Sequence, residues 1–185
     1  MTGSIRSSVP RRALLAAAAI ASAAVLAVPG TASAGGNGVL EVAPYEAVEI
    51  DDQHLMALLP EGRQNYVVSH PDYFTESLEQ ARQQVGAGIR PDSISVGTQR
   101  VDGETILVHG AWRLDERPSE IVIVPEGVEG WGYVAQPVTL EGDPGWGAYY
   151  ASADTFGGDL PESFTVVAYD QDHEPFDEIE VTPWP

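Results

Sequence analysis

The sequence predicts a mainly β protein, in which an antiparallel sandwich follows a shorter strand–helix portion. From about residue 92 onward, short segments rich in Val, Ile, Tyr and Trp recur between turn residues, which is typical of antiparallel sandwiches. Before that point, one segment has the periodicity of an amphipathic helix. The chain of 185 residues contains no cysteine, so packing alone has to hold the fold, and a domain of about 150 residues buries enough surface for that.

Residues 1–34 are expected to be a cleavable signal peptide. Three arginines precede an uncharged apolar stretch, residues 13–28, and Ala32-Ser33-Ala34 forms an A-x-A cleavage site. The apolar stretch is shorter than the roughly 20 residues that a membrane-spanning helix needs. We expect cleavage after Ala34 and secretion. The general secretory route is favoured over the twin-arginine route, because the residues around Arg11-Arg12 make a weak twin-arginine signal.

The net charge restricts the partners. The chain has 28 acidic residues and nine arginines without any lysine, a formal net charge of −19. Removal of the signal peptide takes away three arginines, which leaves 28 acids against six arginines, or −22. Such a surface repels nucleic acids and anionic membranes, so an extracellular protein or a cell-wall polysaccharide is the expected partner. Solubility alone is the alternative reason for the charge.

The N-terminal portion, residues 35–91, is expected to hold short strands and one helix. Alternating or continuous apolar patterns predict strands at 39–42, 45–50, 54–59 and 64–68. The helix, about residues 72–85, is predicted by a stripe of apolar residues, with Ser69 or Asp72 as its cap: Phe74, Leu78, Ala81 and Val85.

The second portion, residues 92–185, is expected to be the sandwich. Asp102-Gly103 is a pair favoured in type I′ hairpin turns, and it joins the first two predicted strands. The predicted strands are 94–101, 104–114, 120–124, 132–140, 146–152, 163–169 and 176–181. In strand number and rhythm, residues 104–182 resemble a bacterial immunoglobulin-like domain of a small secreted actinobacterial protein. The resemblance implies an immunoglobulin-like sandwich but no particular function, because such folds host many functions.

Two similar glycine-flanked aromatic motifs, residues 130–133 and 145–150, are the most specific candidate site. A tryptophan between two glycines has unshielded ring faces, on which a flat ligand such as a sugar can stack. The candidate ligand-binding residues are therefore Trp131, Tyr133, Trp146, Tyr149 and Tyr150. The alternative is that these rings fill the core, as large aromatic side chains usually do.

The densest group of carboxylates lies between the last two predicted strands. Asp170, Asp172 and Glu174 alternate there, and calcium prefers several oxygen ligands from a flexible loop. The spacing of an EF-hand is absent, so the alternative is an ordinary solvated turn. No other cofactor is expected.

Catalytic motifs are absent from the sequence. The four histidines, His54, His70, His109 and His173, form no HExxH motif, and no G-x-S-x-G elbow is present. The sequence therefore favours a secreted, non-enzymatic binding or interaction protein. Three alternatives stay open: a carbohydrate-binding module that uses Trp131 and Trp146, a protease inhibitor with a loop at 125–131 or 142–146, and a small hydrolase with a histidine–carboxylate pair in a cleft.

Overall fold

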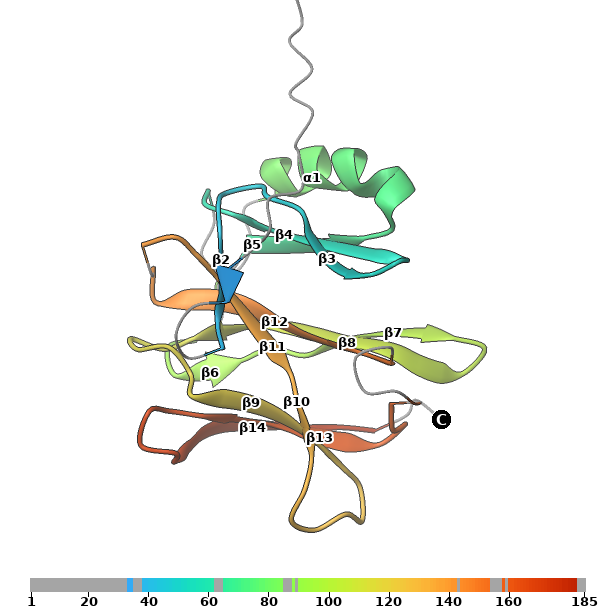
Figure 1. Cartoon of the computed structure of the whole chain (residues 1–185), viewed down its shortest axis with the longest axis vertical. Helices are drawn as coiled ribbons and strands as arrows, with labels where there is room; N and C mark the ends of the chain where they lie inside the picture. The colour runs from blue at the N-terminus through green and yellow to red at the C-terminus, as the bar shows by residue number, and fades with distance from the viewer. Residues whose placement is uncertain are drawn as a thin grey trace, which may run out of the picture.

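The computed structural model describes residues 33–34, 38–61, 65–84, 88, 90–142, 144–153, 158 and 160–182, and these form four stacked layers (Figure 1). The first layer is helix α1 (Phe74–Gln83), preceded by a 3-10 turn, η1 (Pro71–Tyr73). It covers the N-terminal sheet, which consists of β3 (Val48–Asp51), β4 (His54–Leu59) and β5 (Asn65–Ser69) in that order.

The third layer, the central sheet, lies between the N-terminal sheet and the last layer, the outer sheet (Figure 1). The strands of the central sheet are β1 (Ser33–Ala34), β2 (Leu40–Val42), β11 (Gln136–Leu140), β12 (Trp146–Ser152), β8 (Glu104–Arg113) and β6 (Ser93–Ile94), with β7 (Gly97–Val101) also paired to β8. The outer sheet has the order β10 (Tyr133–Val134), β9 (Glu120–Pro125), β13 (Phe164–Tyr169) and β14 (Pro175–Val181). The prediction of a mainly β, antiparallel sandwich with one helix is confirmed, although β2 pairs with β11 in parallel.

Residues 1–32, and with them almost all of the predicted signal peptide, lie outside the described residues. Its last two residues, Ser33 and Ala34, form β1 beside β2. Because β2 belongs to the central sheet, the two portions predicted from the sequence share a sheet. Among the residues that the structure describes, no helix has the length and hydropathy needed to cross a membrane.

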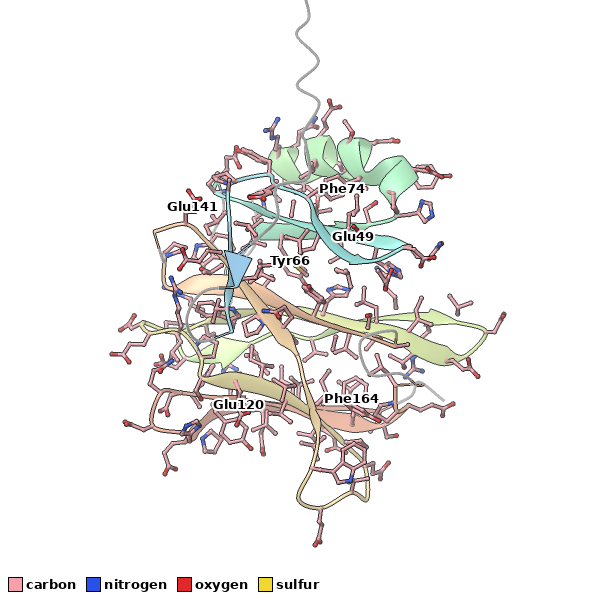
Figure 2. The ribbon with its side chains drawn as sticks, in the orientation of Figure 1. Glu49, Tyr66, Phe74, Glu120, Glu141 and Phe164 are labelled. Carbon is pink, nitrogen blue, oxygen red and sulfur yellow. The ribbon has the colours of Figure 1, made fainter. Side chains whose placement is uncertain are left out.

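The central sheet has another layer on each of its faces, which explains the nearly continuous apolar and buried runs in β8 and β12. One core lies between the central and outer sheets and includes Trp112, Tyr149 and Phe164 (Phe164 is labelled in Figure 2). A second core lies between the central and N-terminal sheets and includes Met56 and Trp146. In the outer sheet, by contrast, buried and half-buried residues alternate along β9 and β13.

Several local predictions are confirmed and two are wrong. Asp102 and Gly103 both have positive φ, 53° and 92°, as a type I′ turn requires. The predicted strand 132–140 is instead two strands, because the chain crosses at Ala135 from the outer sheet to the central sheet. The predicted cap is also wrong: α1 begins after Tyr73, which makes no side-chain capping hydrogen bond, and η1 before it is capped by His70, whose Nδ1 accepts a hydrogen bond from the backbone N–H of Asp72 at 3.2 Å.

The helix itself follows the predicted stripe. Phe74 is buried, and Leu78 and Ala81 are half-buried. Val85, the last predicted member of the stripe, lies outside the described residues. The apolar side of α1 therefore packs on β5 and β4, with which it makes most of its contacts.

Two reciprocal aromatic–glycine pairs join β8 to β12 in the core. Tyr149 on β12 lies directly opposite Gly110 on β8, and Trp112 on β8 lies directly opposite Gly147 on β12. A Cβ atom at Gly147 would lie 2.1 Å from the Val138 carbonyl oxygen and 2.6 Å from the Trp112 ring, so the ring occupies the space of a missing side chain.

Gly147→Ala should therefore lower the free energy of unfolding by about 3 kcal/mol, because the added methyl group has to displace backbone and a buried ring. Urea denaturation followed by circular dichroism measures the loss. Gly158→Ala is the control, since a Cβ at Gly158 meets nothing within 4 Å. The free energy of unfolding of this control variant should stay close to that of the wild type. Equal stability of the two variants would contradict the packing of Trp112 on Gly147.

Candidate functional site

The outer sheet has one face in the core and one face that no described element covers (Figure 1). On β9, Ile121 and Ile123 point into the core, so Val122 and Val124 lie on the uncovered face. Val122 is paired with Val134 on one side and with Val167 on the other, which places a row of three valines across this face. Apolar side chains on an open sheet face are a feature of interaction surfaces.

Trp131 stands at the edge of this row. Its side chain is 54% exposed and Val134 is 56% exposed, and both rank among the few large apolar side chains with such exposure in the described chain. The Trp131 ring meets the Tyr133 ring edge to face, with centroids 5.3 Å apart and planes at 83°. Tyr133 in turn packs against the core between the central and outer sheets, so it connects the exposed indole to that core.

Glycine at position 132 is required for this arrangement. A Cβ atom at Gly132 would lie 2.5 Å from a methyl group of Val122 and 2.8 Å from the carbonyl oxygen of Ile123. The chain therefore passes directly over β9 before β10 begins. Gly130, on the other side of Trp131, has a φ of 79°, which favours glycine. Both glycines of the motif thus serve to place Trp131 beside the sheet.

These residues enclose an open groove of about 350 Å³ on the outer sheet. We call it the Trp131 groove, and its lining consists of Glu120, Val122, Val124, Gly130, Trp131, Gly132, Val134 and Tyr169. Glu120 is the one acidic residue among these described lining residues, and it lies directly across from Tyr169 (Glu120 is labelled in Figure 2). The groove therefore combines an exposed indole, an apolar floor and one carboxylate.

The structure does not bring all five predicted ligand-binding residues together. Trp131 and Tyr133 are neighbours at the outer sheet, but the other three residues lie on the central sheet. Trp146 is only 6% exposed and packs in the core toward the N-terminal sheet. Tyr149 is fully buried and donates a hydrogen bond to the Ser95 carbonyl at 2.7 Å. For Trp146 and Tyr149 the structure thus favours the alternative of core packing.

The predicted calcium ligands form a closed hairpin turn. One carboxylate oxygen of Asp170 accepts hydrogen bonds from the backbone N–H groups of Asp172, at 2.9 Å, and Glu174, at 3.0 Å. His173, between them, has a positive φ of 60°. Within the described residues, no group of three or more acidic or histidine side chains is placed to hold a metal ion. Asp170 therefore closes the turn between β13 and β14.

Two histidines that the sequence left unconnected lie between the central and N-terminal sheets. His54 is buried and its Nδ1 lies 2.7 Å from Oδ1 of Asp51. His109 has its Nδ1 2.9 Å from the Tyr66 hydroxyl, and the two rings meet edge to face (Tyr66 is labelled in Figure 2). Burial, and secondarily the nearby His54, lowers the pKa of His109 to about 4, while burial raises the pKa of Tyr66 to about 12.

The Asp51–His54 pair is the kind of pair that the hydrolase alternative requires. It borders a small cavity of about 200 Å³, whose other lining residues are Asp52, Gln53, Ile106 and Ala153. None of these is a Ser, Thr, Cys or Lys that could serve as a nucleophile. Asp51 also accepts a hydrogen bond from the backbone N–H of Gln53 at 2.9 Å, so it shapes the β3–β4 turn.

His54 begins the apolar segment 54–59 and His109 lies inside the apolar segment 104–114, and these positions are the signal in the sequence that could have placed the two histidines between layers. Comparison with known proteins does not add to this geometry: no family model, no curated protein and no solved structure matches the chain.

Proposed function

We propose that this chain is a secreted binding protein whose ligand-contacting surface is the Trp131 groove. The observation that carries the proposal is an exposed indole beside a row of valines, on a sheet face that no described element covers. Every other sheet face among the described residues packs against a neighbouring layer (Figure 1). Exposed tryptophan in a shaped apolar groove is characteristic of binding hot spots.

We infer further that the central and outer sheets form an immunoglobulin-like sandwich. The order of strands supports this inference. On one sheet the order is β7, β8, β12 and β11, and on the other it is β10, β9, β13 and β14. In an immunoglobulin sandwich the first four strands correspond, in the same order, to strands A, B, E and D. The second four correspond, in the same order, to strands C′, C, F and G. The N-terminal layers then cover the first sheet and leave the second, with its groove, available for a ligand.

Trp131→Ala should weaken ligand binding at least tenfold, because tryptophans at the centre of an interface contribute most of its affinity. The probes are cytochrome c as a basic protein, measured by biolayer interferometry, and insoluble cellulose, chitin and peptidoglycan, measured by co-sedimentation. The polysaccharides test the carbohydrate-binding alternative, which Trp131 retains even though Trp146 is buried.

Tyr73→Ala is the matched control, since Tyr73 is an exposed aromatic residue, 64% exposed, at the opposite layer of the molecule. Its binding should equal that of the wild type. If wild type and Trp131→Ala behave alike with all four probes, the Trp131 groove is not the ligand-contacting surface.

A further inference from the structure

We propose that the Trp131 groove receives lysine or arginine side chains of a basic polypeptide segment. This inference rests on the proposed function and specifies the partner. The aliphatic part of such a side chain would lie on the valines, and its charged end would lie between the Trp131 ring and the Glu120 carboxylate.

The outer sheet is strongly acidic. After Arg117, which is paired with Glu41, the remaining sequence contains no lysine or arginine. All of β9, β10, β13 and β14 and their turns come after that residue. Acidic residues are frequent on these strands and the described turns beside them, at Glu120, Glu126, Glu129, Glu162, Asp170, Asp172, Glu174, Asp177, Glu178 and Glu180. This layer therefore attracts a positively charged partner and repels a negative one.

The described lining of the groove combines apolar side chains with an indole and a carboxylate. Val122, Val124 and Val134 offer apolar contact to a chain of methylene groups, which lysine and arginine bury readily. Tryptophan is the best aromatic partner for a cation above its ring. Glu120 supplies the opposite charge at the same groove. An aliphatic stem with a cationic end matches all three features.

The described lining suits a cation better than a sugar. Sugar hydroxyls need several hydrogen-bonding side chains around the stacking ring. Among the described residues that line the groove, the polar groups are those of Glu120, Tyr169 and the indole N–H of Trp131, without any Asn, Gln, Ser, Thr or Arg. A single carboxylate in an apolar groove suits a single positive charge better than a ring of hydroxyls.

The test uses three fluorescein-labelled peptides of the sequence Gly-Xaa-Val-Xaa-Gly-Xaa-Val-Xaa-Gly, in which Xaa is lysine, acetyl-lysine or glutamate. Fluorescence anisotropy at 150 mM NaCl measures binding to the full chain. The lysine peptide should bind, and the acetylated and acidic peptides should not. Trp131→Ala should weaken binding of the lysine peptide about tenfold, and Glu120→Gln should weaken it about threefold to tenfold.

Glu49→Gln is the matched control, because it removes the same charge from β3 on the N-terminal sheet, far from Glu120 (Figure 2). Its affinity should equal that of the wild type. Equal losses in Glu49→Gln and Glu120→Gln would show attraction by overall charge and overturn the inference. Absence of binding by the lysine peptide would overturn it too. If the acetylated peptide, or a polysaccharide, binds in a manner that depends on Trp131, the groove remains a binding surface but its ligand is not cationic.

Discussion

Replacing Trp112 by alanine should lower the free energy of unfolding by about 3 to 5 kcal/mol, the usual cost of truncating a buried aromatic side chain. Trp112 is fully buried between the central and outer sheets, where it lies against Gly147. A glycine has no side chain that could move into the vacated space, so the cavity would remain. The Trp112 Nε1 is buried without a hydrogen-bond partner among the described residues, and removing that unpaired group offsets part of the loss.

Urea denaturation followed by circular dichroism measures this loss, with Trp131→Ala as the matched control. Trp131→Ala removes the same atoms as Trp112→Ala, but the Trp131 side chain is exposed, and its described ring partner is Tyr133. The control should lose no more than ~1.5 kcal/mol, the value of one aromatic pair. A loss in Trp112→Ala no larger than in Trp131→Ala would show that Trp112 is not part of the core.

The fold class could be predicted because the outer sheet has one buried face. Along β13, Phe164, Val166 and Ala168 are buried and the residues between them are half-buried, so alternation is visible in the sequence. The number of layers could not be predicted. β12 is buried along almost its whole length because a sheet lies on each side of it, but a continuous apolar run does not show what covers it.

The candidate site could be predicted only in part, because similar local sequences lie in different environments. Trp131 and Trp146 both stand between glycines, yet Trp131 precedes a strand at the open face and Trp146 begins a strand of the central sheet, which lies between two other sheets. Burial is decided by strand pairing over long distances, which neighbouring residues do not determine. The contact between Tyr66 and His109, 43 residues apart, is a further example.

Acidification from pH 6.5 to pH 4 should destabilise the fold by up to ~3 kcal/mol through His109 alone. The pKa of His109 is lowered to about 4 in the folded protein from an ordinary value of 6.5. The unfolded chain therefore binds a proton in this range that the folded protein does not bind. The contribution of the neutral His109 to the free energy of unfolding is present above pH 6.5, and it is lost as the pH falls toward 4.

The reason for the lowered pKa is the position of His109 between two layers. Protonation of His109 would place a positive charge among half-buried and buried groups. These groups include the half-buried Tyr66 and Tyr150 and the buried Asp51–His54 pair. The described hydrogen-bond partner of the His109 ring is the Tyr66 hydroxyl, whose own pKa is raised to about 12. No carboxylate is bonded to the His109 ring in the described residues to compensate the charge.

His109→Gln tests this explanation, because glutamine keeps a polar group but does not titrate. Its free energy of unfolding is measured by urea denaturation between pH 4 and pH 8. Below pH 6.5 this free energy should fall less steeply with pH than that of the wild type, because the variant takes up one proton fewer on unfolding. His70→Gln, which changes a histidine at the start of η1 and leaves the interlayer contacts intact, should keep the wild-type slope. If both variants keep the wild-type slope, the acid sensitivity arises elsewhere, and His109 does not join the two layers in the way its contacts indicate.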